Sequence, residues 1–207
     1  MLNLIEMGGP VMWLLAGCGL VAGLIFFERL LHLHRAQIDA GDFLQGICNI
    51  LRRDNIVEAV SICEETPGPI AYLVRAAVLH HSEPRGNMEQ AIREAGLHEV
   101  PRLERNLNLL LTLAQICPLI GLLGTVLGMI NSLVSIEQGS PLVHAGDVSH
   151  GLWIALITSA AGLAIAIPAY AGYNFLLGRV EAIVLDMERA AGEILAFLAK
   201  RQAEEAS

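Results

Sequence analysis

Four hydroxyl side chains in two long apolar stretches are the residues of this chain best suited to chemistry away from water. Thr125 and Ser132 lie in one stretch, and Thr158 and Ser159 lie in the other. A hydroxyl group both donates and accepts hydrogen bonds, so several of them can hold a file of water molecules. Hydroxyl groups cannot store a proton near neutral pH, and neither stretch contains a carboxylate. The pattern is therefore compatible with a stripe that lines a pore, although these hydroxyl groups supply no titratable group of their own.

Small residues share one helical face with these hydroxyl groups. At about 100° per residue, the face of the first stretch comprises Ala114, Pro118, Gly121, Thr125, Gly128 and Ser132, with Gly124 and Gly128 as a small-xxx-small pair. The second stretch offers Ala155, Thr158, Ser159, Gly162 and Ala166, followed by Pro168. Small residues let helices approach closely in lipid. The residues alone leave two interpretations open, namely simple helix packing and a stripe that lines a pore.

Three stretches without Asp, Glu, Lys or Arg provide the elements that must position these side chains. They are residues 7–27, 106–136 and 148–178. About 20 helical residues cross a hydrocarbon core of roughly 30 Å. The chain is 54% hydrophobic and only 16% charged, which is far more apolar than a soluble domain requires. We therefore expect an all-α membrane protein with three transmembrane helices, solvated by a lipid bilayer.

The distribution of basic residues predicts the orientation of these helices. None of the 13 Lys and Arg residues lies before residue 27 or between residues 136 and 151. Lys and Arg accumulate in cytoplasmic segments, so the predicted topology is N-out and C-in. The predicted parts are an outer N-terminus with the first transmembrane helix (1–28), a cytoplasmic helical segment (29–105), the second transmembrane helix (106–136), a short periplasmic loop (137–147), the third transmembrane helix (148–178) and a cytoplasmic C-terminal helix (179–207).

The cytoplasmic parts are predicted to fold into amphipathic helices. Asp54 is the expected cap of a helix that runs to about Glu65, with breaks at residues 66–69 and 82–87. In the tail, apolar residues recur at steps of three and four, which is typical of a helix face in a bundle. They are Leu177, Val180, Val184, Met187, Ala191, Ile194 and Leu198.

Other chemistry finds little support in the sequence. The four cysteines show no Cys-x-x-Cys spacing, so neither a metal site nor a disulfide is expected. His144 and His150 in the outer loop could gather protons, although loop histidines are more often simply solvated. No nucleophile, His and acid constellation and no phosphate-binding loop occurs. We expect no enzyme activity, no cofactor and no nucleic-acid partner.

Three long motifs resemble a known family. The string Pro-Leu-Ile-Gly-Leu-Leu-Gly-Thr-Val-Leu-Gly-Met-Ile at residues 118–130 is similar to the second-span signature of the ExbB/TolQ/MotA proton-channel family. Residues 155–169, followed by Tyr173 and Asn174, resemble its third-span signature. Residues 8–13 and 27–30 resemble short members of the ExbB branch. The resemblance covers nearly the whole chain in order.

This resemblance implies a function and a set of partners. It implies a homo-oligomer, usually a pentamer, in the bacterial inner membrane, around single-span helices of an ExbD- or TolR-like partner that bears a membrane Asp. Proton flow would then energise TonB-dependent outer-membrane transport through a TonB-like protein. Thr125 matches the family's second-span threonine, and Ser159 stands where the third span has a threonine. Ile154 stands where the family often has an acidic residue, so a proton-relay role is absent there.

Two other functions stay open. A TolQ-like subunit that supports envelope integrity has the same expected architecture, and nothing physical in the sequence separates it from the ExbB branch. A non-conducting membrane scaffold would also be compatible with the small-residue faces, and it predicts no dependence on the hydroxyl groups of Thr125 and Ser159.

Overall fold

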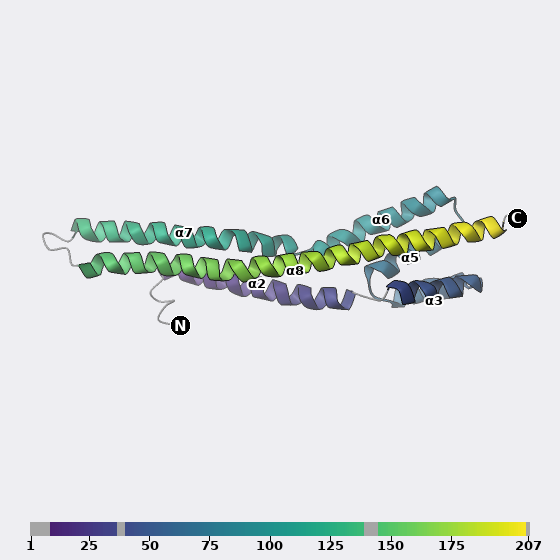
Figure 1. The fold of residues 1–207 in the computed structure, drawn as a ribbon, viewed down its shortest axis with the longest axis horizontal. Helices are drawn as coiled ribbons and strands as arrows, with labels where there is room; N and C mark the ends of the chain where they lie inside the picture. Colours follow the sequence, from purple (N-terminus) through teal and green to yellow (C-terminus); the bar gives the residue numbers. More distant parts are fainter. Residues whose placement is uncertain (1–8, 37–39, 139–144, 206–207) are drawn as a thin grey trace. The chain divides into compact units, whose positions relative to one another are not determined.

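The computed structural model describes residues 9–36, 40–138 and 145–205, and every element in these ranges is an α-helix (Figure 1). The helices are α2 (Gly9–Ala36), α3 (Ala40–Arg52), α4 (Ile56–Glu65), α5 (Pro69–Leu79), α6 (Arg85–Glu104), α7 (Leu107–Gln138) and α8 (Ala145–Glu205). Three helical stretches are long and apolar enough to cross a membrane: Gly9–His34, Arg85–Val134 and Gly151–Glu204. The predicted fold class, an all-α membrane protein, is confirmed.

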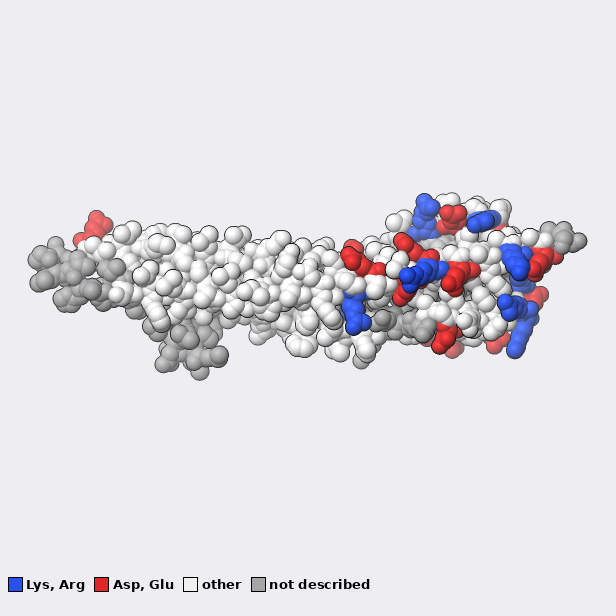
Figure 2. Space-filling model, in the orientation of Figure 1, with Lys and Arg blue, Asp and Glu red and all other residues white. Residues whose placement is uncertain are grey.

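The chain divides into two compact units. The first contains α2 up to Arg29, all of α7 and α8 up to Leu176. Its core is narrow, with Leu15 from α2, Cys117 from α7 and Ala166 from α8 at its centre. Many large apolar side chains of these helices are exposed, among them Leu20, Leu119 and Leu163. Figure 2 shows a long white stretch of surface without Lys, Arg, Asp or Glu, bounded at its left end by an acidic patch. An uncharged surface of this kind suits solvation by lipid.

The second unit contains residues 30–105 and α8 from Leu177 onward. Charged side chains gather on this part of the surface in Figure 2. The predicted stripe of the tail faces inward: Val180, Met187, Ile194 and Leu198 are buried, and Leu177 is partly buried. Apolar residues of α5, such as Leu73 and Val74, are buried as well. The helical periodicity therefore identified the packed faces of this unit.

The helix boundaries in the second unit correct one prediction and refine another. Asp54 does not cap α4; Asn55 does, because its Oδ1 accepts a hydrogen bond from the backbone N–H of Glu58 at 3.3 Å. Asp54 instead has φ 61°, in the left-handed region. The predicted break at residues 66–69 is confirmed, since α4 ends at Glu65 and α5 begins at Pro69. The second break covers residues 80–84, slightly earlier than expected.

Several predictions lie outside the described residues. These are the outer N-terminus at residues 1–8, most of the predicted periplasmic loop with His144, and the last two residues of the tail. The third transmembrane helix and the C-terminal helix, predicted as separate parts, are one continuous helix, α8. The helix α8 continues through Gly178 without a break.

Candidate functional site at the contact of α7 and α8

The two small-residue faces predicted from the sequence meet each other inside one chain, and Figure 1 shows α7 and α8 running side by side. At Gly121 the backbones nearly touch: a Cβ there would lie 2.9 Å from the carbonyl oxygen of Thr158 and 3.2 Å from the Cα of Ser159. Gly162 faces the same point from α8, where a Cβ would lie 2.7 Å from the carbonyl oxygen of Cys117. Only glycine allows this close approach.

One turn further along α7, Gly124 makes room for Thr158. A Cβ at position 124 would lie 2.6 Å from the Cβ of Thr158. The Thr158 side chain is completely buried, with an exposed fraction of 0%. Its hydroxyl donates to carbonyl oxygens of its own helix, at 3.0 Å from Ile154 and 2.9 Å from Ala155. In this conformation Thr158 therefore belongs to the packed contact between the helices.

The contact extends towards the end of α7 through Gly128 and Ser132. A Cβ at Gly128 would lie 2.7 Å from the carbonyl oxygen of Gly151 and 3.0 Å from the Cβ of Ala155. A Cβ at Gly151 would overlap the Ser132 hydroxyl. Gly151 was not singled out from the sequence, although it continues the small face of α8 by one step of four residues beyond Ala155. Extending the periodic pattern to the first turns of α8 would have found it.

The remaining hydroxyl groups are also bonded to helix carbonyls. Thr125 Oγ1 donates to the carbonyl of Leu122 at 2.5 Å, and Ser132 Oγ donates to that of Gly128 at 3.2 Å. Ser159 differs because its Oγ donates across the contact to the carbonyl of Gly121, at 3.4 Å. Thr125 and Ser132 keep exposed fractions of 9% and 8%, and Ser159 is half-buried. Of these three residues, Ser132 lies inside the packed contact beside Gly151, Thr125 is buried, and Ser159 is the most exposed.

Both prolines lie within continuous helices. Pro118 is partly buried in α7, and Pro168 is exposed in α8. Proline lacks the N–H that would bond to the carbonyl four residues earlier, so each leaves one carbonyl without its usual helical partner. Ile154 is partly buried. Its side chain is apolar and carries no titratable group.

The first transmembrane helix packs on this pair through two further glycines. A Cβ at Gly172 of α8 would lie 2.8 Å from the Phe26 ring, and a Cβ at Gly19 of α2 would lie 3.3 Å from the Ile165 side chain. Sequence reasoning did not assign either glycine, since their partners lie far away in the sequence. They hold α2 against α8 in the first unit.

The histidines and cysteines show no second candidate site within the described residues. His80 Nδ1 lies 2.9 Å from the carbonyl of Ala76, and His81 Nδ1 lies 2.9 Å from that of Val78, so both bond to the last turns of α5. No group of three or more His, Cys, Asp or Glu residues that could hold a metal ion occurs in the part of the chain that the structure describes.

Comparison with known proteins decides the family. The sequence profile of the MotA/TolQ/ExbB proton channel family matches residues 65–189, which include α7 and the α8 segment that packs on it. The chain belongs to this family. The family is described as a proton channel family, which is in keeping with the transport-related names of the relatives below.

Individual family members are similar over most of this MotA/TolQ/ExbB chain. It is 26% identical to the biopolymer transport protein ExbB of Neisseria meningitidis, with 91% of this chain and 92% of that protein covered. It is 30% identical to the putative biopolymer transport protein ExbB-like 1 of Synechocystis, with 82% and 68% covered. A putative ExbB homolog of Methanothermobacter thermautotrophicus is 22% identical over 87% of this chain. The chain spans 64% of the length of that protein.

Proposed function

We propose that this chain is an ExbB-like subunit of a motor in the bacterial inner membrane that is driven by the proton-motive force. In this proposal the chain forms a homo-oligomer, a pentamer, around single-span helices of an ExbD-like partner. The proposed topology is N-out and C-in, and the motor acts through a TonB-like protein on TonB-dependent outer-membrane transport. The family assignment and the ExbB names of its relatives support this role.

The observation that carries the proposal is the composition of the α7–α8 contact. It combines hydroxyl groups with an apolar lining, and no carboxylate is present from residue 107 to residue 136 or from 148 to 176. A proton path at membrane depth needs a titratable group. The partner's Asp would supply it, while Thr125, Ser159 and Ser132 offer hydrogen bonds that offset its desolvation. Because Thr158 is fully enclosed within the chain, we assign it to helix packing and not to the pathway.

The available driving force is sufficient for mechanical work. One elementary charge that crosses a potential of 100 mV releases about 2.3 kcal/mol. The backbones of α7 and α8 are in van der Waals contact at Gly121 and Gly162. This close contact holds the two helices together as one pair. In the proposed motor, this pair acts as the stationary wall against which the partner helix moves.

The experiment is proton flux into vesicles that contain this chain with its single-span partner. Thr125→Val removes a hydroxyl at nearly constant volume, and we expect it to reduce flux at least tenfold. The matched control is Thr112→Val, because Thr112 also lies in α7 and also donates to a carbonyl of its own helix, that of Asn108 at 2.7 Å, yet its side chain is exposed. Equal flux in both variants, or unchanged flux without the partner, would refute the proposed division of labour.

A non-conducting scaffold is the second candidate function. The specific observation in its favour is that all four hydroxyl groups already bond to helix carbonyls within one chain. This candidate predicts that Thr125→Val and Ser159→Ala leave flux and outer-membrane uptake unchanged. A TolQ-like role for the same architecture predicts that deletion of the gene impairs envelope integrity while uptake persists.

A further inference from the structure

An apolar groove lies within the second compact unit, between α6 and α8. Its volume is about 300 Å³, and its lining includes Val100 and Glu104 from α6, and Glu181, Val184, Leu185 and Glu188 from α8. Leu185, one of the lining residues, is 47% exposed. An exposed leucine beside a hollow provides apolar area that an occupant can bury.

The charges around this groove have one sign. Three carboxylates, those of Glu104, Glu181 and Glu188, lie on its wall, and no basic side chain lines it. Each of these glutamates is exposed. Within the part of the chain that the structure describes, none of the three takes part in an ion pair. The groove therefore combines apolar contact area with unneutralised negative charge, which complements a segment that is both apolar and basic.

The groove also occupies a defined place along the chain. Glu104 is the last residue of α6, three residues before α7 begins, and the α8 part of the lining starts directly after the first unit ends at Leu176. In the topology proposed above, this is the cytoplasmic end of the second and third transmembrane helices. A protein that crosses the membrane once concentrates Lys and Arg next to the cytoplasmic end of its helix.

We infer that the groove binds the basic, amphipathic segment that adjoins the transmembrane helix of the single-span partner. The inference rests on the proposed function, since it requires such a partner and a cytoplasmic location of α6. Val184 and Leu185 contact apolar side chains of the segment, and the three glutamates pair with its Lys or Arg residues. The contact fixes the cytoplasmic end of the partner to the stationary subunit.

Two other occupants fit the groove less well. An anionic lipid headgroup would be repelled by the three carboxylates. A second copy of this chain carries a formal net charge of -8, and two of its arginines next to the groove residues already pair within the chain, Arg102 with Glu99 at 2.7 Å and Arg189 with Asp186 at 3.5 Å. Charge complementarity therefore favours a partner of a different sequence.

The test is site-specific photo-crosslinking in native membranes with the full-length chain. A benzophenone amino acid replaces Val184 in the groove, and in a matched control it replaces Val57, which is 81% exposed on α4 and lies outside the groove. Mass spectrometry then maps the crosslinked peptide. We expect Val184 to capture a single-span protein at a segment with Lys or Arg next to its membrane helix, and Val57 not to capture it.

Charge variants make the result quantitative. The triple variant Glu104→Gln, Glu181→Gln and Glu188→Gln should lower the crosslinked fraction about tenfold, because each exposed ion pair contributes modestly. A control triple variant removes the same charge elsewhere: Glu65→Gln, Glu89→Gln and Glu94→Gln, all exposed and outside the groove. This control should leave the crosslinked fraction unchanged. An equal effect of both triples would overturn the charge-based recognition.

The remaining outcomes separate this inference from the proposed function. If the partner co-purifies and proton flux persists, but Val184 crosslinks to lipid, to a second copy or to another part of the partner, the groove assignment is wrong and the motor stands. If no single-span protein co-purifies, both are wrong.

Discussion

Thr158 of α8 occupies the space that any side chain at position 124 of α7 would need. The two residues lie on different helices, and a Cβ at Gly124 would lie 2.6 Å from the Thr158 Cβ and 3.1 Å from its Cγ2. Thr158 is also completely buried, whereas the Thr125 and Ser132 side chains of the same contact keep a small exposed fraction. The α7–α8 pair is therefore held by shape complementarity between a glycine and a threonine, which couples the two longest apolar helices of the chain.

Gly124→Ala should destabilise the protein. In an isolated helix this change stabilises by about 0.5–1 kcal/mol, but here the added methyl group forces α7 and α8 apart, which typically costs about 1–3 kcal/mol. The measurement is the midpoint of thermal unfolding in detergent. Gly23→Ala is the matched control, because a Cβ at Gly23 meets no atom within 4 Å. A stabilised Gly124→Ala variant would show that the helices are not in close contact.

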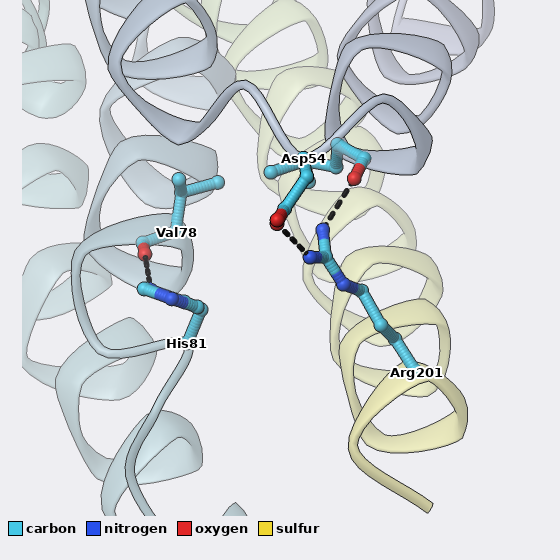
Figure 3. A network of polar contacts seen from close by, with 5 residues as sticks. Asp54, Val78, His81 and Arg201 are labelled. Carbon is cyan, nitrogen blue, oxygen red and sulfur yellow. Dashed lines mark hydrogen bonds and ion pairs between the residues drawn. The ribbon is translucent and has the colours of Figure 1, made fainter. Parts of the chain in front are cut away.

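The end of α8 is fastened to the turn between α3 and α4, and we expect Arg201 to govern the order of this turn. The Arg201 guanidinium donates to the carbonyl of Leu51. It also donates to the carboxylate of Asp54, and Figure 3 shows these two side chains together. Arg201→Lys should accelerate hydrogen exchange around residue 54, because an ammonium group cannot make both bonds with the same planar geometry. The control Lys200→Arg, at an exposed site, should not change the exchange rates.

The variant Asp54→Asn removes the carboxylate charge at the same turn while it preserves the backbone conformation. Asparagine tolerates the left-handed φ of 61° that position 54 adopts, so only the ion pair is lost. Asp54 is exposed, and exposed ion pairs contribute up to about 1 kcal/mol. We therefore expect a smaller change in hydrogen exchange than in Arg201→Lys. An equal or larger change would mean that the carboxylate, and not the Leu51 carbonyl, is the main partner.

The N-cap of α4 provides a local stability prediction. Asn55 accepts from the Glu58 N–H, and its Nδ2 donates to the Glu58 carboxylate at 2.6 Å. Asn55→Ala should lower the free energy of unfolding by about 1 kcal/mol, as the loss of a side-chain cap usually does. Asn87→Ala, at an exposed position without such a bond in α6, is the control. Denaturant unfolding of the two variants in detergent compares them directly, and equal midpoints would contradict the capping role.

The raised pKa of the buried Cys63 thiol makes the free energy of unfolding depend on pH. Burial raises its pKa from 9.0 to about 11; the nearby Arg75 lowers it, and Glu64 raises it. The folded state thus holds the thiol proton more tightly than the unfolded state. Its contribution is fully present below pH 9 and is lost as pH rises towards 11. Cys63→Ala should flatten this part of the stability curve, although it lowers stability at pH 7. An unchanged slope between pH 9 and 11 would contradict the prediction.

The same burial should protect Cys63 from alkylation. A maleimide reacts with the thiolate, and the raised pKa keeps the thiolate population low at pH 8. The Cys63 modification, followed by mass spectrometry, should be slow in the native protein and fast after unfolding. Rapid modification of the native protein would show that the second unit opens around α4.

Much of the architecture follows from the sequence, for identifiable reasons. In lipid, the backbone N–H and C=O groups of a charge-free stretch of about 20 residues or more find hydrogen-bond partners within the stretch when it is a helix. The three apolar helices were therefore predictable. The three-and-four spacing in the tail identified Val180, Met187 and Ile194 as inward-facing. The cap of α4 was misplaced by one residue, because Asp54 and Asn55 are both good capping residues and only the backbone conformation distinguishes them.

The sequence by itself determined which faces of α7 and α8 are small and weakly polar, because helical periodicity depends only on local geometry. Only the tertiary structure decided what these faces contact. It placed Gly124 against Thr158 and Gly128 against Gly151, and it enclosed the Thr158 hydroxyl, which the sequence left as a pore-lining candidate. The physical reason is that a small residue permits close approach without specifying the partner, so the pairing depends on how two helices far apart in sequence fit together.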